Sequence, residues 1–356
     1  MSTGEAKAFL ERLDDAARNL MLSVARAVSF TRGARLVRAG ELSLGAYTLR
    51  EGAAEANVVL PGGDRLTVAK LGPGSLFGEM ALIERGTNTA TVVASSNVDG
   101  WFFDRDDFRA LVAQRSPEAQ RVQHLLTLVL AEKLRAMNTK VLEVAAPEDK
   151  PARKADGADP LAEVKRLRKS AFDFRPFLPA LPVFEGFDAD EIDEVLDASR
   201  LLELPRGHGV FAIGQPSDAA FVVLRGAVEI VSREAKRERR MAVLGPGQIF
   251  GFMSLLERGA HGFAAAVREE ALLLEFPRAG FEALYYGGGA VSNALHRALQ
   301  RSLLVSLAQT NRHLTRLISL ARLRGANRVG DKLETALGEQ IVAAPEAAPA
   351  TPARAA

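Results

Sequence analysis

A glycine-rich segment with one glutamate is the first group of residues whose types and spacing could do chemistry. Residues 72–82 read Gly-Pro-Gly-Ser-Leu-Phe-Gly-Glu-Met-Ala-Leu. Glycine lets the backbone turn sharply and approach a ligand closely. We expect a short helix to begin at Glu79, where free N–H groups would suit an anion such as phosphate. The Glu79 carboxylate could also accept a hydrogen bond from a sugar hydroxyl, and the segment Asn88–Val92 is expected to return as a strand beside this cradle.

The cradle occurs twice because the chain repeats itself. Four positions recur after 174 residues: Gly33, Gly40, Tyr47 and Gly52 are followed by Gly207, Gly214, Phe221 and Gly226. Others recur after 173 residues: Leu71–Gly74, Phe77–Gly78, Glu84–Gly86, Leu130, Leu134 and Asn138 are answered by Leu244–Gly247, Phe250–Gly251, Glu257–Gly259, Leu303, Leu307 and Asn311. Agreement at this many fixed offsets indicates a duplication, with one residue lost in a loop.

The elements that must position the cradle are short and separated by glycines. The runs with strand character are Ala46–Leu49, Ala56–Leu60, Leu66–Leu71, Thr91–Val93 and Trp101–Phe103. Pro61–Asp64 predicts a hairpin turn between two of them. In the second copy, Asp188 is expected to cap a helix that begins the repeat. Many short strands at regular spacing predict a mainly β fold with flanking helices, built as two tandem double-stranded β-helix (jelly-roll) barrels.

A long helix is expected to close each copy. Its apolar stripes are Val122, Leu125, Leu126, Val129, Leu130, Leu134, Met137 and Val141 in copy 1, and Leu295, Leu299, Leu303, Leu307, Leu314 and Leu317 in copy 2. A stripe at helical spacing suits packing on the helix's own barrel and suits a homodimer seam equally well. Both interpretations stay open.

Domain boundaries follow from the repeat and from composition. Residues 1–144 form domain 1, residues 145–174 a linker, residues 175–330 domain 2, and residues 331–356 a disordered tail. The linker opens with a polar, proline-bearing stretch, and the tail is rich in alanine and proline. Two charged stretches, Arg233–Arg240 and Arg166–Ser170, are expected to be a solvated hairpin loop and a solvated helix start.

The glycine spacing and the cradle together resemble the cyclic-nucleotide-binding domain family, which includes protein kinase A regulatory subunits and the catabolite activator protein. The family's cassette reads Phe-Gly-Glu-(Leu/Ile)-Ala-Leu, followed by Arg-(Ala/Ser/Thr)-Ala-(Thr/Ser). The resemblance covers about residues 5–142 and 178–320. It implies a glutamate that binds the ribose 2′-hydroxyl and an arginine that pairs with the cyclic phosphate, with cAMP or cGMP as ligand.

Carried onto this chain, the resemblance keeps the glutamate and loses the arginine. The expected ligand-binding residues are Phe77, Gly78, Glu79, Met80, Ala81, Asn88, Thr89, Ala90 and Thr91, with Asn88 at the arginine position. Thr89 leaves cGMP open as a ligand, since cGMP-selective family members often carry Thr there. The second site is expected to be degenerate, at Gly251, Phe252, Met253, His261 and Gly262. Phe252 replaces the glutamate and His261 the arginine, and a pH-dependent phosphate contact by His261 is the alternative there.

Composition and missing motifs exclude several function classes. There are no cysteines, so disulfides and thiolate sites are excluded. The five histidines lack metal-ligand spacing, and no hydrolase or nucleotide-triphosphatase motif is present, so we expect no metal, no cofactor and no enzyme. A net charge of +2 gives no global basic field. No apolar run could span a bilayer and no signal peptide begins the chain, which predicts a cytoplasmic protein.

The sequence therefore predicts a cyclic-nucleotide-binding regulator that acts on a protein partner, with the ligand in domain 1. DNA binding through a helix-turn-helix is disfavoured, because only about 20 residues separate the second long helix from the tail. The alternative function is a ligand-independent scaffold built from two degenerate domains.

Overall fold

The computed structural model describes residues 8–59, 65–144, 160–162, 164, 166–167, 174–234 and 237–323. The predicted hairpin turn at residues 61–64, the first part of the predicted linker, Arg168–Ser170 and the predicted tail lie outside the described residues. The chain divides into two compact units, one formed by Met1–Ala145 with Leu303–Ala356 and the other by Ala146–Ser302. Each is described by itself.

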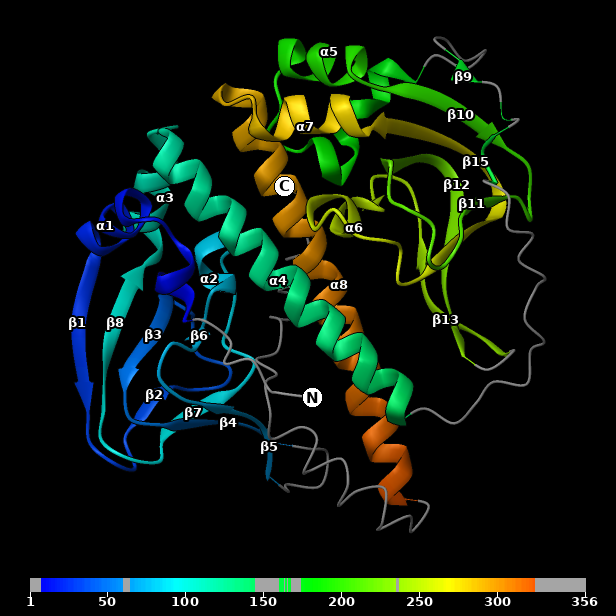
Figure 1. Cartoon of the computed structure of the whole chain (residues 1–356). Coiled ribbons are helices and arrows are strands. Elements are labelled where there is room, and N and C mark those ends of the chain that lie inside the picture. Colours follow the sequence, from blue (N-terminus) through cyan, green and yellow to red (C-terminus); the bar gives the residue numbers. More distant parts are fainter. Residues whose placement is uncertain are drawn as a thin grey trace, which may run out of the picture. The chain divides into compact units, whose positions relative to one another are not determined.

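Unit 1 is a barrel of two antiparallel four-stranded sheets with helices before and after it (Figure 1). Its elements are η1 (Phe9–Arg12), α1 (Asp15–Ser23), β1 (Ala25–Phe30), β2 (Arg35–Val37), β3 (Gly45–Glu51), β4 (Ala54–Val59), β5 (Arg65–Leu71), β6 (Leu76–Phe77), α2 (Met80–Ile83), β7 (Thr91–Ala94), β8 (Val98–Asp104), α3 (Arg105–Ala113) and α4 (Pro117–Val144). The sheet orders are β1-β8-β3-β6 and β2-β7-β4-β5.

All five strands expected in copy 1 are present. The predicted hairpin between Ala56–Leu60 and Leu66–Leu71 is confirmed, because β4 and β5 pair antiparallel with Val59 opposite Arg65. Sequence reasoning missed β1, β2 and β6. β6 has two residues and β2 three, too few to show a period, and β1 is not buried on alternate residues in any regular way.

Unit 2 repeats this architecture with longer strands. Its elements are β9 (Arg166–Leu167), η2 (Arg175–Ala180), η3 (Pro182–Phe184), α5 (Ala189–Asp197), β10 (Arg200–Leu204), β11 (Gly209–Phe211), β12 (Ala219–Glu234), β13 (Arg237–Leu244), β14 (Ile249–Phe250), α6 (Phe252–Leu256), β15 (Ala264–Pro277), α7 (Arg278–Tyr286) and α8 (Gly289–Leu323). By the repeat offsets, β12 stands for β3 and β4 together, and β15 for β7 and β8. The mainly β, jelly-roll-like fold with flanking helices is confirmed.

Two expectations about unit 2 need correction and one is confirmed. The stretch Arg233–Arg240 is not a loop: β12 continues to Glu234 and β13 begins at Arg237, with Arg233 paired with Glu238. Alternating charges on paired strands can satisfy the ladder as well as a loop can. Asp188 does cap α5, accepting from the backbone N–H of Glu191 at 2.8 Å.

Part of the segment expected as linker belongs to unit 2. Leu161 is buried in the core of that unit, and β9 pairs with β10 through Leu167 and Leu201. His208 Nε2 lies 2.9 Å from the carbonyl oxygen of Pro160. Isolated apolar residues in a polar stretch gave no periodic signal from which to expect this packing.

The duplicated glycines are structural in both copies. Gly52 and Gly226 both have φ of +84°. A Cβ on Gly52 would lie 2.0 Å from the carbonyl oxygen of Asn97, and one on Gly226 would lie 2.1 Å from that of Glu270. Since only glycine fits such a left-handed, closely approached position, these glycines are required by the barrel rather than by a ligand.

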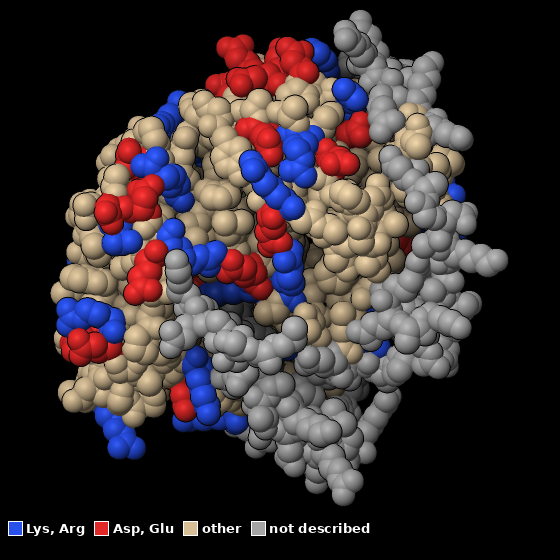
Figure 2. Space-filling view, viewed as in Figure 1, with Lys and Arg blue, Asp and Glu red and all other residues tan. Residues whose placement is uncertain are grey.

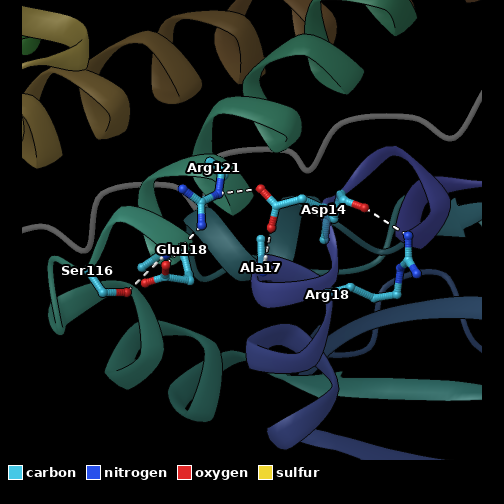
Figure 3. Close-up of polar contacts among 8 residues, drawn as sticks. Asp14, Ala17, Arg18, Ser116, Glu118 and Arg121 are labelled. Carbon is cyan, nitrogen blue, oxygen red and sulfur yellow. Dashed lines mark hydrogen bonds and ion pairs between the residues drawn. The ribbon is translucent and has the colours of Figure 1, made fainter.

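The long helix α4 packs on its own barrel along its first half. Val122, Leu125, Leu126 and Val129 share one buried cluster with residues of η1, α1, β8 and α3. Figure 3 shows how its first turns are tied to α1: Arg121 Nε lies 2.6 Å from Asp14 Oδ2, and Asp14 also caps α1 by accepting from Ala17. The own-barrel interpretation therefore holds for this part of the stripe. A homodimer seam stays a prediction for both helices.

Candidate functional site

Unit 1 contains an open cavity of about 440 Å³ formed around the predicted cradle. It is lined by Val37, Ser43, Phe77, Gly78, Met80, Ala81, Glu84, Gly86, Thr87, Asn88, Thr89, Ala90 and Val92. Seven of the nine predicted ligand-binding residues are in this set. Glu79 and Thr91 are not. A volume of this size is within the range of small-molecule pockets.

Gly78 shapes the cradle wall by its backbone. Its φ is +73°, and a Cβ there would lie 2.7 Å from the carbonyl oxygen of Gly45 on β3. The chain can therefore turn from β6 into α2 only with glycine at this position. Glu79 directly precedes α2, as the sequence predicted, but its side chain does not cap the helix.

The Glu79 carboxylate turns to α4 and is fully buried. Glu79 has no exposed surface, and Lys133 Nζ lies 2.9 Å from its Oε1. Lys133 also donates a hydrogen bond of 3.2 Å to the carbonyl oxygen of Leu76. Neither Glu79 oxygen has a partner in hydrogen-bonding geometry. The residue that the family would use for ribose is thus held by the long helix.

Sequence reasoning missed Lys133, although a signal existed. Lys133 lies four residues after Val129 and four before Met137, both of them buried stripe positions. A lysine on the buried face of a helix needs an acidic partner or a route to water. The separation of 54 residues between Glu79 and Lys133 gave no means of naming that partner from the sequence alone.

Asn88 does not replace the missing arginine. Its backbone N–H and its Nδ2 both donate to the carbonyl oxygen of Glu41, at 2.8 and 3.2 Å, and its own carbonyl accepts from Gly40 at 2.7 Å. Arg85 is exposed and does not line the cavity. The lining therefore contains no lysine or arginine among the described residues. Thr91 Oγ1 accepts from the backbone N–H of Ala39 at 3.1 Å, so this hydroxyl holds the neighbouring loop.

The loop before β3 also contributes to the site, which the sequence did not predict. Ser43 donates its backbone N–H to the carbonyl of Gly86 at 2.9 Å, and Leu42 forms an isolated bridge with Thr87. Ser43 and Thr87 bring hydroxyl groups to the lining beside Thr89, while Glu84 brings a carboxylate. The cavity is thus rich in hydroxyl and amide groups.

The corresponding place in unit 2 is filled by aromatic rings. Phe211 stacks on His261 with ring centroids 3.7 Å apart, and Phe211, Phe221 and Phe250 lie within 6.1 Å of one another. Phe211 and His261 occupy the repeat positions of Val37 and Asn88, which line the cavity in unit 1. Two rings therefore stand where copy 1 has a small apolar side chain and an amide.

The other predicted residues of the second site do not reopen it. Phe252 is buried at the start of α6, Gly251 before it has φ of +80°, Met253 is half-buried and Gly262 is exposed. Burial lowers the pKa of His261 from 6.5 to about 4, against an opposing effect of Asp218. His261 is therefore neutral at pH 7, which removes the basis for a phosphate contact there.

Charge and metal-ligand chemistry add no second centre. On the face shown in Figure 2, lysine and arginine side chains lie interspersed with aspartate and glutamate. The described residues contain no group of three or more His, Asp or Glu side chains that could hold a metal ion. Within the same residues, no helix is both long and apolar enough to cross a membrane.

Comparison with known proteins agrees with this geometry. The cyclic nucleotide-binding domain family matches residues 27–115 and 201–286. A CRP-like cAMP-activated global transcriptional regulator of Mycobacterium tuberculosis is 30% identical over 118 residues, which is 33% of this chain and 51% of the relative. The cyclic AMP receptor protein of Thermus thermophilus is 33% identical over 117 residues, 33% of this chain and 52% of that protein.

The chain thus spans about half the length of the curated relatives it matches. Among solved structures, the regulatory domain of Toxoplasma gondii protein kinase A with cAMP aligns with a TM-score of 0.31 and 19% identity, covering 81% of this chain and 90% of that one. Both matched segments of the family contain one cradle each, as the duplication predicted. This chain therefore carries two tandem domains of the cyclic nucleotide-binding family.

Proposed function

We propose that unit 1 binds a cyclic nucleotide in the cavity around Gly78 and that occupancy regulates a protein partner. The observation that carries the proposal is the cavity itself, because the cassette backbone from Phe77 to Ala81 and the segment from Asn88 to Ala90 form its wall. These are the segments that the family uses for phosphate and ribose. Unit 2 supplies no comparable opening in its described residues, so the ligand is assigned to unit 1.

The chemistry of the lining predicts weak binding. A cyclic phosphate would find hydroxyl, amide and backbone N–H donors, but no guanidinium. A hydrogen bond to a charged group is worth about 1.5–3 kcal/mol, so the loss of the arginine weakens binding by about ten- to a hundredfold. We therefore expect dissociation constants well above those of a domain with a complete cassette.

Both cAMP and cGMP are candidates. The two curated relatives above are named for cAMP, which favours it. Thr89 lines the cavity at the position where a hydroxyl is common in cGMP-selective relatives. A guanine amino group could donate to that hydroxyl, whereas adenine offers no such donor there.

Isothermal titration of the whole chain with cAMP and with cGMP tests the proposal. Saturable binding with a stoichiometry of one, and a ligand-dependent rise in the unfolding temperature, are the expected results. The same titration on an Ala81→Phe variant, which fills the cavity wall, should show no binding. Absence of heat and of thermal shift at millimolar concentrations of either nucleotide would refute the proposal.

We propose the regulatory role without a catalytic one, since the matched family is a binding family and the candidate site has no catalytic arrangement. A homodimer through the long helices, a cytoplasmic location and the lack of DNA binding stay predictions. DNA binding is measured by titrating labelled duplex DNA in the presence and absence of cAMP, and we expect no affinity beyond that for random sequence.

A ligand-independent scaffold is the second candidate function, and the closed second site favours it. The Phe211–His261 stack shows that one copy has kept the barrel while filling the site. If unit 1 serves the same purpose, partner binding will be unchanged by either nucleotide and by Glu79→Ala.

A further inference from the structure

The ion pair between Glu79 and Lys133 joins the nucleotide cassette to the long helix α4. Lys133 Nζ lies 2.9 Å from Glu79 Oε1, and the same ammonium group bonds the carbonyl of Leu76 at 3.2 Å. The glutamate side chain is completely buried, whereas the lysine side chain is 20% exposed. The pair therefore connects a buried acid in the barrel with a helix residue that still reaches water.

The carboxylate depends on this one cation. No other hydrogen-bond partner is described for either Glu79 oxygen. A buried charge that loses its partner is strongly unfavourable, so a group that offers Glu79 a new donor competes with Lys133 directly. Glu79 lies between Gly78 and Met80, both in the cavity wall, so such a donor would come from a ligand in the cavity.

The second copy shows that the barrel does not need this pair. The repeat positions of Glu79 and Lys133 are Phe252 and Ser306, so both partners are replaced together. Unit 2 nevertheless forms the same strands, cassette turn and short helix. The ion pair is present only in the copy whose cavity is open, which separates it from the requirements of the fold.

We propose that Lys133 is a latch that competes with a ribose 2′-hydroxyl for Glu79, so that ligand binding in unit 1 frees α4 from the cassette. The inference rests on the proposed nucleotide site and deepens it by naming the residue that links occupancy to the helix. A ligand hydroxyl that donates to Glu79 takes the place of Lys133, whose ammonium group turns to solvent. The segment of α4 beyond Lys133 then loses its polar tie to the barrel.

The test measures binding of cAMP and of 2′-deoxy-cAMP to the full chain by isothermal titration. Lys133→Met removes the competitor, so cAMP should bind about tenfold more tightly or better, the size of one hydrogen bond to a charged group. The 2′-deoxy analogue lacks the competing donor, so its affinity should change by less than about twofold. Lys133→Arg keeps a cation and should behave as the wild type.

A matched control is available one residue away on α4. Arg12 Nη2 lies 2.6 Å from Glu132 Oε1, an exposed pair that does not touch the cassette. Glu132→Gln removes this tie of α4 to η1 and should leave both affinities unchanged. Hydrogen exchange of α4 gives a second readout: cAMP should speed exchange around Lys133 in the wild type, while Lys133→Met should exchange fast without nucleotide.

The outcomes separate the latch from the site. Equal affinities of wild type and Lys133→Met for cAMP, or a loss of affinity that is the same for cAMP and its 2′-deoxy analogue, would overturn the latch and leave the nucleotide site standing. Failure of both proteins to bind cAMP would overturn the proposed function and the latch together. If Lys133→Met does not fold, the Lys133→Gln variant takes its place, with the same expected contrast between the two nucleotides.

Discussion

Replacing Asn88 by arginine should restore the cation that the cavity of unit 1 lacks. Asn88 lines the cavity, and its main-chain bonds to Glu41 and Gly40 do not depend on its side chain. The substitution loses only the 3.2 Å bond from Asn88 Nδ2 to the carbonyl of Glu41, worth about 1 kcal/mol. A charge-assisted bond to a cyclic phosphate returns about 1.5–3 kcal/mol.

The net expectation is a gain of about tenfold in affinity for cAMP and for cGMP. Isothermal titration at a fixed ionic strength measures it, because screening weakens the pair at high salt. His261→Arg is the matched control at the same repeat position of unit 2. It should produce no new binding, since Phe211 and its aromatic neighbours fill that site.

Unchanged affinity of the Asn88→Arg variant, with its stability intact, would refute the reasoning that the missing arginine limits binding in unit 1. A second binding event in His261→Arg would refute the conclusion that the second site is closed by packing. The two results are independent, so each half of the argument can fail alone.

Two further predictions concern stability. Because burial lowers the pKa of His261 from 6.5 to about 4, the unfolded chain binds more protons than the folded one between these values. Stability from this residue is therefore complete above pH 6.5 and falls with pH, by about 2 kcal/mol between pH 7 and pH 5 in urea unfolding. His261→Phe should reduce this slope, and an unchanged slope would contradict the assignment. Gly52→Ala should cost at least about 2 kcal/mol more than Gly33→Ala in the same assay. Both glycines have φ of +84°, but only the Cβ on Gly52 meets a backbone oxygen, and equal losses would count against that argument.

Duplication and fold class could be predicted from the sequence because they depend on local patterns. Glycine is required wherever the backbone adopts a positive φ, so the paired spacing of Gly33 and Gly40 with Gly207 and Gly214 recorded eight-stranded geometry before any strand was assigned. Apolar runs broken by these glycines fixed the strand type. The extent of β12 and β15 was not predictable, since a strand that crosses from one sheet to the other keeps pairing through bulges that leave no clear period.

The cavity wall was also predictable in large part, because the cassette is contiguous and its backbone does the shaping. The sequence alone determined that copy 1 keeps a glutamate and lacks an arginine, and that copy 2 lacks both. Only the tertiary structure decided what the remaining side chains do. It turned Glu79 to Lys133, tied Asn88 to Glu41, and stacked Phe211 on His261. Each of these contacts joins residues distant along the chain, and their direction depends on which neighbour satisfies a buried charge, an amide or a ring, which spacing in a sequence does not specify.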